Sequence, residues 1–235
     1  MRSSFYARMA YRAVKQIWGI EVICAGNIAR SPIAEAVGNS YVAKRGLTDR
    51  LLILSSGMSV DTPPDFNRIQ RFITLADRLP TDERFPRTPE ESVVIDGVIY
   101  DGEAAQRYAE DEAYCTRVNE LTERSREDLR RVGRTQRDAV LAEVGLQCRS
   151  DMKQTVLTPD ISLILGLDRT VASAARFIYG SAYPIYTLGE YAGSEPDVED
   201  PVGVIDLEVY RALRDQLTAD MQKAVDRFAH AHQLG

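Results

Sequence analysis

A cysteine and an arginine six residues apart point to chemistry on an oxyanion. Cys24 opens the run Cys-Ala-Gly-Asn-Ile-Ala-Arg-Ser-Pro, which places Arg30 at the far end of one short loop. The other two cysteines, Cys115 and Cys148, have leucine and glutamine at that offset. A thiolate nucleophile and a planar guanidinium fork at the two ends of one loop suit the binding and attack of a phosphate-like group.

The flanking residues predict elements that position this loop. An apolar strand is expected over 20–24 and a helix over 32–46, with Ser31 and Pro32 suited to its cap and first position. A strand–loop–helix turn aims backbone N–H groups at an anion and favours the thiolate form of the cysteine. The predicted phosphate site therefore comprises Ala25, Gly26, Asn27, Ile28, Ala29 and Ser31.

A purely structural interpretation treats Cys24 as a small buried hydrophobe at a strand end and Arg30 as a surface charge. A bare Cys-x5-Arg does occur by chance. The preceding strand, the following helix and the Gly26-Asn27 pair inside the loop favour the functional interpretation.

The loop resembles that of the low-molecular-weight protein tyrosine phosphatases, in particular bacterial members. Their signature is a strand followed by Cys-x-Gly-Asn-x-Cys-Arg-Ser-Pro-x-Ala-Glu. The chain is similar to this family over about 19–60 and 134–235 and lacks the resemblance between them. The matching residues of the loop and following helix are Cys24, Gly26, Asn27, Arg30, Ser31, Pro32, Ala34 and Glu35.

This resemblance implies a phosphatase that works through a cysteinyl-phosphate and needs no metal or other cofactor. It implies that Cys24 is the nucleophile, that Arg30 holds the phosphate oxygens, and that Asp200, followed by Pro201, is the general acid. Taken alone, Asp-Pro is also an ordinary turn sequence.

The resemblance also implies supporting roles for two further residues. Ser56 follows the second strand within Ser55-Ser56-Gly57. Asp168 follows the third strand, where an acidic residue in the family can steady the loop arginine. The alternative for Asp168 is a solvated loop residue.

The chain departs from the family at two places. Ala29 replaces the second loop cysteine, which captures an oxidised nucleophile. Val202 and Gly203 follow Asp-Pro where tyrosine-directed members have tyrosines, so an aromatic wall would have to come from elsewhere. Candidates for such a wall are Tyr100, Tyr108 and Tyr114.

The predicted substrate is a phosphorylated protein or peptide, with phosphotyrosine favoured. A protein-arginine phosphatase remains open, because the ending resembles those enzymes, although Ile28 is the tyrosine-type choice. An arsenate reductase would need two further cysteines close together, which Cys115 and Cys148 are not in sequence. A non-catalytic phosphoprotein-binding module is the alternative from another class, and it would tolerate loss of Cys24 or Asp200.

The order of elements predicts an α/β fold with a doubly wound, four-stranded parallel sheet flanked by helices. Strands are expected at 20–24, 51–55, 161–167 and 183–187. Helices are expected at 32–46, 134–144, 170–179 and 206–232. We assign residues 19–235 to one phosphatase-like domain.

Residues 61–133 do not follow this pattern and are predicted to form an inserted, mainly helical subdomain. A helix is expected at 65–79, and Gly133 is expected to break a long charged helical stretch that begins at Glu103. Between them, β-branched runs around Asp96-Gly97 predict a β-hairpin at 93–100. The insert begins at the carboxyl end of the second parallel strand, which is the edge of the sheet where ligands bind, so it should lie beside the active site.

Residues 1–18 carry four basic residues and no acid, and their apolar spacing predicts an amphipathic N-terminal helix. This helix and the insert are candidate contacts in a homo-oligomer.

Composition excludes several classes of function. A net charge of −6 argues against nucleic acid as a partner. An odd number of cysteines, three, argues against a disulfide framework and for the cytoplasm. No integral membrane segment is expected, and the two histidines lack metal-ligand spacing.

Overall fold

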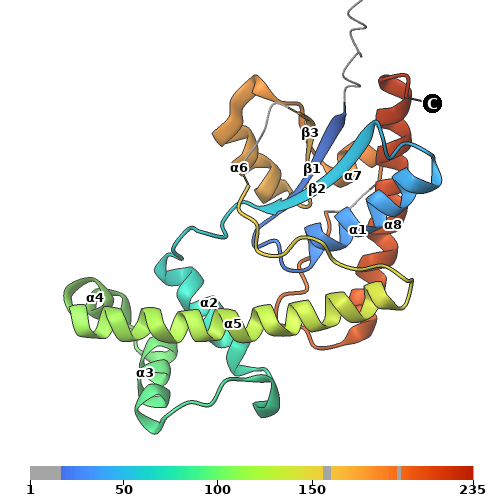
Figure 1. The fold of residues 1–235 in the computed structure, drawn as a ribbon. Helices are drawn as coiled ribbons and strands as arrows, with labels where there is room; N and C mark the ends of the chain where they lie inside the picture. The colour runs from blue at the N-terminus through green and yellow to red at the C-terminus, as the bar shows by residue number, and fades with distance from the viewer. Residues whose placement is uncertain (1–16, 156–159, 195–196, 235) are drawn as a thin grey trace, which may run out of the picture.

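The computed structural model describes residues 17–155, 160–194 and 197–234, and Figure 1 shows a parallel sheet joined to a group of helices. The sheet has the order β2–β1–β3–β4 and every pair is parallel. Its strands are β1 (Trp18–Cys24), β2 (Leu51–Gly57), β3 (Ile161–Gly166) and β4 (Ile185–Thr187). The predicted four-stranded parallel sheet is thereby confirmed. The predicted N-terminal helix falls almost wholly on residues 1–16, outside the described residues.

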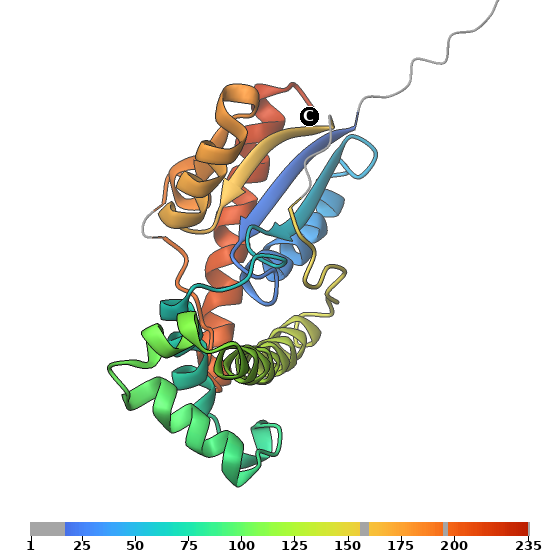
Figure 2. The ribbon, with the colours of Figure 1, turned by 90° about the vertical axis from the view of Figure 1, so that its left-hand side faces the viewer.

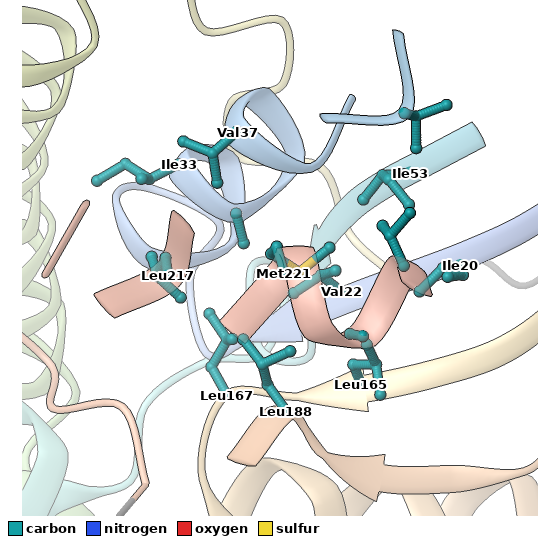
Figure 3. Packing of buried hydrophobic residues seen from close by; sticks show 14 of the residues in the cluster. Ile20, Val22, Ile33, Val37, Ile53, Leu165, Leu167, Leu188, Leu217 and Met221 are labelled. Carbon is teal, nitrogen blue, oxygen red and sulfur yellow. The ribbon is translucent and has the colours of Figure 1, made fainter. Parts of the chain in front are cut away.

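Helices cover both faces of the sheet (Figures 1 and 2). On one face lie α1 (Arg30–Lys44), α7 (Leu188–Ala192) and α8 (Leu207–Ala231), and on the other lies α6 (Arg169–Tyr179). In Figure 3, Leu217 and Met221 of α8 face Ile33 and Val37 of α1 and the strand residues of the sheet. These fully apolar contacts explain why β1 and α1 hold a fixed geometry at the loop between them.

Residues 61–133, called the insert below, are helical throughout their regular elements. The insert contains α2 (Phe66–Asp77), a short 3-10 turn (Thr81–Glu83), α3 (Pro89–Tyr100) and α4 (Ala104–Glu110), and it continues into α5 (Glu112–Ala142). Its apolar centre joins Ile69 and Ile73 of α2 to Ile95 and Val98 of α3 and to Val118 of α5. In Figure 1 the insert extends away from the sheet as a separate lobe.

The predicted hairpin at 93–100 is wrong, because these residues belong to α3. Thr88 accepts a hydrogen bond from the Glu91 amide, and the Glu91 side chain accepts one from the Thr88 amide. This capping box, with Pro89 at the first position, starts a helix. Ile95 and Val98 then lie three positions apart on its buried face, so Asp96-Gly97 is not a turn.

The predicted break at Gly133 is also wrong. The helix α5 runs for 31 residues through this position, from the insert to the main core. A Cβ at Gly133 would lie 2.9 Å from the Cγ2 atom of Ile28. Gly133 therefore permits close passage of α5 beside the loop that follows β1, while Val140 and Leu141 pack in the core under the sheet.

The described helices include none that is long and apolar enough to cross a lipid bilayer.

Candidate active site

The Cys24 loop binds its own thiol from two sides. The Asn27 amide donates to Cys24 Sγ at 3.2 Å, and Ser31 Oγ lies 3.0 Å from the same sulfur. Cys24 is only 3% exposed. The Asn27 amide donates to the buried sulfur, and Ser31 Oγ lies within hydrogen-bond distance of it, so the thiol is fixed in a position that suits a nucleophile.

Asn27 is the internal brace of the loop. It is fully buried and adopts a left-handed φ of 51°, which asparagine tolerates well. Its Nδ2 atom donates to Ser31 Oγ and Ser55 Oγ, each at 3.0 Å, and its Oδ1 atom accepts from the Lys153 amide at 2.9 Å. The sequence motif indicates Asn27, but it gives no sign that β2 and the 153 segment complete its hydrogen bonds.

The support continues behind Asn27. Ser55 Oγ donates to Glu35 Oε2 at 2.6 Å, which ties β2 to α1. Ser56 contributes through its carbonyl, which accepts from Ser31 Oγ at 3.2 Å, while its hydroxyl is shared with Thr155. Ser56 therefore supports Ser31 as part of the frame and does not line the cavity.

Arg30 is held by two carboxylates. Its Nη1 atom donates to Asp168 at 2.8 Å and to the Val198 carbonyl at 3.1 Å, and its Nη2 atom donates to Asp200 at 2.7 Å. Burial alone would lower the pKa of Arg30, but the charges of Asp200, Cys24 and Asp168 raise it above its ordinary value. The guanidinium is therefore a fixed positive charge within the site.

The two carboxylates differ in setting. Asp168 caps α6 by accepting from the Val171 amide, so its position is fixed from two directions. Asp200 is 37% exposed and lines the cavity above the loop. The next residue, Pro201, presents its carbonyl to Tyr210 Oη at 3.3 Å. Burial and the charge of Asp200 raise the pKa of Tyr210, which keeps this phenol protonated as a donor.

A cavity of about 170 Å³ opens over the loop and gathers most of the predicted residues. Cys24, Arg30 and Asp200 line it together with four of the predicted loop residues, namely Ala25, Gly26, Ile28 and Ala29. Asn27 and Ser31 do not line the cavity but contact Cys24. Asp168 and Pro201 also lie outside the lining, where Asp168 accepts from Arg30 and the Pro201 carbonyl accepts from Tyr210.

The aromatic wall comes from residues that sequence inspection missed. Phe72 of α2 and Tyr210 of α8 line the cavity. The three tyrosines proposed for this role do not: Tyr100 is 80% exposed, while Tyr108 and Tyr114 pack within the insert. The sequence could have indicated Phe72 only through its position on α2, which packs against α5, the helix that leads back to the Cys24 loop.

The insert also supplies most of the charge around the opening. Four arginines of the insert line the cavity, and Asp200 is the only carboxylate among the lining residues that the structure describes. Arg137, farther along α5, donates to the Ile28 carbonyl at 2.7 Å and to Asp151 at 3.0 Å. These arginines reach the loop only because the chain folds back on itself, so the motif around Cys24 could not predict them.

Within the described residues, histidine, cysteine and carboxylate side chains form no group of three or more that could hold a metal ion.

Part of the chain matches a known protein family. Residues 19–123 match the family model described as low molecular weight phosphotyrosine protein phosphatase. This match extends through much of the insert, where inspection of the sequence found no resemblance. No curated protein matches the chain.

Several solved structures are similar in fold. A mutant of YwlE from Bacillus subtilis is 18% identical, with a TM-score of 0.52, and the match covers 90% of this chain and 98% of that one. The low molecular weight protein tyrosine phosphatase of T. tengcongensis is 20% identical, with a TM-score of 0.52 and coverage of 89% and 98%. A protein tyrosine phosphatase from Entamoeba histolytica is 14% identical, with a TM-score of 0.52 and coverage of 92% and 99%.

Residues 19–123 thus resemble the low molecular weight phosphotyrosine protein phosphatases, a family of cysteine-dependent phosphoester hydrolases, and the chain shares the fold of solved structures of that kind.

Proposed function

We propose that the chain hydrolyses phosphorylated protein side chains, with phosphotyrosine as its substrate, through an intermediate on Cys24. The observation that carries this proposal is the convergence of three groups on one cavity. Cys24, with the Asn27 amide and the Ser31 hydroxyl beside its sulfur, lies at the base, Arg30 lies at the end of the same loop, and Asp200 lines the opening.

The reaction proceeds in two steps. Cys24 attacks phosphorus and forms an S–P bond while the P–O bond to the substrate breaks, and Asp200 gives its proton to the leaving oxygen. Arg30 and the loop amides hold the equatorial oxygens as charge develops. Asp200 then takes a proton from water, which attacks phosphorus, breaks the S–P bond and releases phosphate.

The cavity lining favours phosphotyrosine over phosphoarginine. Phe72, Leu129 and Val202 provide apolar surface above the loop that suits an aromatic ring. A guanidinium leaving group would meet the insert arginines and only one carboxylate, Asp200, among the described lining residues. Like charges in a confined site disfavour such a substrate. One fold relative is described as the YwlE arginine phosphatase, which keeps that activity as the second candidate.

Hydrolysis of p-nitrophenyl phosphate by the wild type and by Cys24→Ser tests the chemistry. The variant should lose turnover but still bind inorganic phosphate, because the loop amides and Arg30 remain. Cys115→Ser, which changes a cysteine of the insert outside the cavity, is the matched control and should keep full activity. Full activity in Cys24→Ser would refute the proposal. Parallel assays with phosphotyrosine and phosphoarginine peptides then decide between the two substrates.

A further inference from the structure

The insert presents a group of arginines to the mouth of the cavity. Arg68 and Arg71 lie one turn apart on α2, and Arg126 and Arg130 lie one turn apart on α5. Figure 1 shows α2 running against α5 on the side of the sheet where the Cys24 loop lies. We call these four residues the arginine rim.

The positive charge of the rim is local. The chain as a whole carries a net charge of −6, so a general surplus of basic residues does not explain it. The rim and Arg30 bring five guanidinium groups to the lining, against the single carboxylate of Asp200 among the described lining residues. A concave surface of one sign concentrates ligands of the opposite sign.

The α5 half of the rim is held in position. Arg126 pairs with Glu123 at 2.5 Å and lies 5.5 Å from the centre of the Phe72 ring. Arg130 is 3.5 Å from Glu123 and 3.6 Å from Glu127. Even so, burial and the charge of Arg126 hold the pKa of Arg130 below its ordinary value.

The α2 half of the rim has no such neighbours. Arg68 and Arg71 are exposed, and neither guanidinium makes an ion pair or hydrogen bond with any residue that the structure describes. Two unpaired arginines beside two positioned arginines leave unused donors at the opening. Planar guanidinium groups bind carboxylate and phosphate oxygens in pairs.

We propose that the arginine rim binds a second anionic group of the substrate, so that the enzyme selects phosphopeptides with an acidic or phosphorylated residue next to the scissile phosphate. The proposal rests on the function proposed above and adds the sequence context of its substrate. Arg68 and Arg71 are open to solvent, which suits the side chain of a flanking peptide residue better than an enclosed small molecule. A carboxylate of an acidic residue and a phosphate of a phosphorylated residue share the same chemistry, a group of anionic oxygens that guanidinium can bind.

Three phosphotyrosine peptides that differ only beside the phosphorylated residue test the proposal. One carries glutamine, one glutamate and one phosphoserine at the flanking positions. For each protein the readout is the ratio of kcat/KM for the glutamate or phosphoserine peptide to that for the glutamine peptide. Exposed ion pairs are individually weak. Two of them should give a wild-type ratio of about tenfold, which falls toward one in Arg68→Glu/Arg71→Glu.

Arg78→Glu/Arg117→Glu is the matched control, because these arginines are exposed, belong to the insert and do not line the cavity. It changes the net charge equally and should keep the wild-type ratio. The proposal is overturned if the wild type shows no preference, if the rim variant retains it, or if both double variants lose it equally. A preference for phosphoserine alone would identify a second phosphate as the ligand, and a preference for both peptides would identify any anionic side chain.

Binding of the same peptides to Cys24→Ser separates this proposal from the catalytic one. An affinity ratio that depends on Arg68 and Arg71 supports the rim even if the wild type shows no turnover. Turnover without any such ratio refutes the rim and leaves the phosphatase proposal intact.

Discussion

Arg30 donates to the carboxylate of Asp200 across 2.7 Å, although 170 positions separate the two residues. The same guanidinium also binds Asp168, and Asp168 is fixed as the cap of α6. Asp200 thus occupies one of the donors that Arg30 would turn toward a phosphate. Asp200, the proposed general acid, and a phosphate in the loop would therefore compete for one arginine, and replacing Asp200 should affect phosphate binding and turnover in opposite directions.

Asp200→Asn should lower kcat by about 10²–10⁴ for a substrate with a poor leaving group, and by less for p-nitrophenyl phosphate. In the Cys24→Ser background the same change should tighten inorganic phosphate binding by about threefold or more, because one carboxylate charge beside the dianion is removed. Steady-state kinetics and calorimetry measure the two effects. Asp197→Asn, which changes the neighbouring acid that pairs with Arg169, is the control. Weaker phosphate binding in Asp200→Asn would contradict the competition.

Oxidation of Cys24 should be poorly reversible. The loop holds Ala29 where the family has its second cysteine, and neither Cys115 nor Cys148 lines the cavity with Cys24. A sulfenic acid with no nearby thiol continues to the irreversible sulfinic acid. Activity after peroxide and then dithiothreitol should therefore recover less in the wild type than in Ala29→Cys. Equal recovery in the two proteins would show that another reaction protects Cys24.

Gly133→Ala should disturb the phosphate loop. A helical Gly→Ala change ordinarily stabilises by up to about 1 kcal/mol. At Gly133 the new Cβ would meet Ile28 at 2.9 Å, so the gain should vanish and the KM for p-nitrophenyl phosphate should rise severalfold. Gly97→Ala is the matched control, because a Cβ there meets nothing within 4 Å.

Adding Ile28→Ala to Gly133→Ala tests the cause of the Gly133 effect. The second change removes the Cγ2 atom that the new Cβ would approach. Part of the lost affinity should then return. Chemical denaturation and steady-state kinetics on both glycine variants and the double variant measure this. A Gly133→Ala protein as active and as stabilised as Gly97→Ala would contradict the close contact.

Glu21→Gln should stabilise the protein at neutral and alkaline pH. Glu21 lies in β1 at 2% exposure, and its Oε1 atom has no hydrogen-bond partner among the described residues. Burial raises its pKa, so the folded state holds this proton at a higher pH than the unfolded chain does. Stability contributed by this group is therefore lost as pH rises above the unfolded value of about 4.3.

The gain in free energy of unfolding for Glu21→Gln should reach about 1 kcal/mol at pH 8. It should shrink at pH 5, where keeping the buried carboxyl protonated costs less free energy. Urea unfolding at the two pH values measures it. Glu120→Gln, at an exposed position of α5, should change stability little at either pH. A gain for Glu21→Gln that grows toward acid pH would contradict the assignment.

The sequence indicates the sheet and the Cys24 loop because both depend on local order. Strand–loop–helix chemistry around Cys24 and Arg30 is encoded within about a dozen residues, and alternating strands and helices imply parallel pairing. The pairing of Arg30 with Asp168 follows only from the family resemblance, and the sequence does not predict its pairing with Asp200, since no local rule links residues so far apart. The structure shows that both carboxylates reach the guanidinium.

The errors concentrate in the insert, where local signals compete. Asp96-Gly97 between β-branched residues is typical of a hairpin, but the capping box at Thr88 and Glu91 starts a helix ahead of it. Gly133 is typical of a helix end, but in α5 the absence of a side chain there leaves room for Ile28. Packing of Ile95 and Val98 against α2 and α5 reinforces the first case, the contact with Ile28 decides the second, and the fold of the insert also places Phe72 at the cavity.

The unbroken helix α5 fixes the distance between the Cys24 loop, which it contacts at Ile28, and two arginines of the arginine rim. Gly133 marks the point where the helix touches the catalytic loop at Ile28, and Arg130 and Arg126 precede it on the same helix. At 1.5 Å per residue these two arginines stand about 4.5 Å and about 10.5 Å along the axis from that point. An extended peptide advances about 3.3–3.6 Å per residue, so the span covers about three positions. The helix therefore limits which substrate positions the rim can contact. Acidic residues more than about three positions from the phosphorylated side chain should have little effect on kcat/KM.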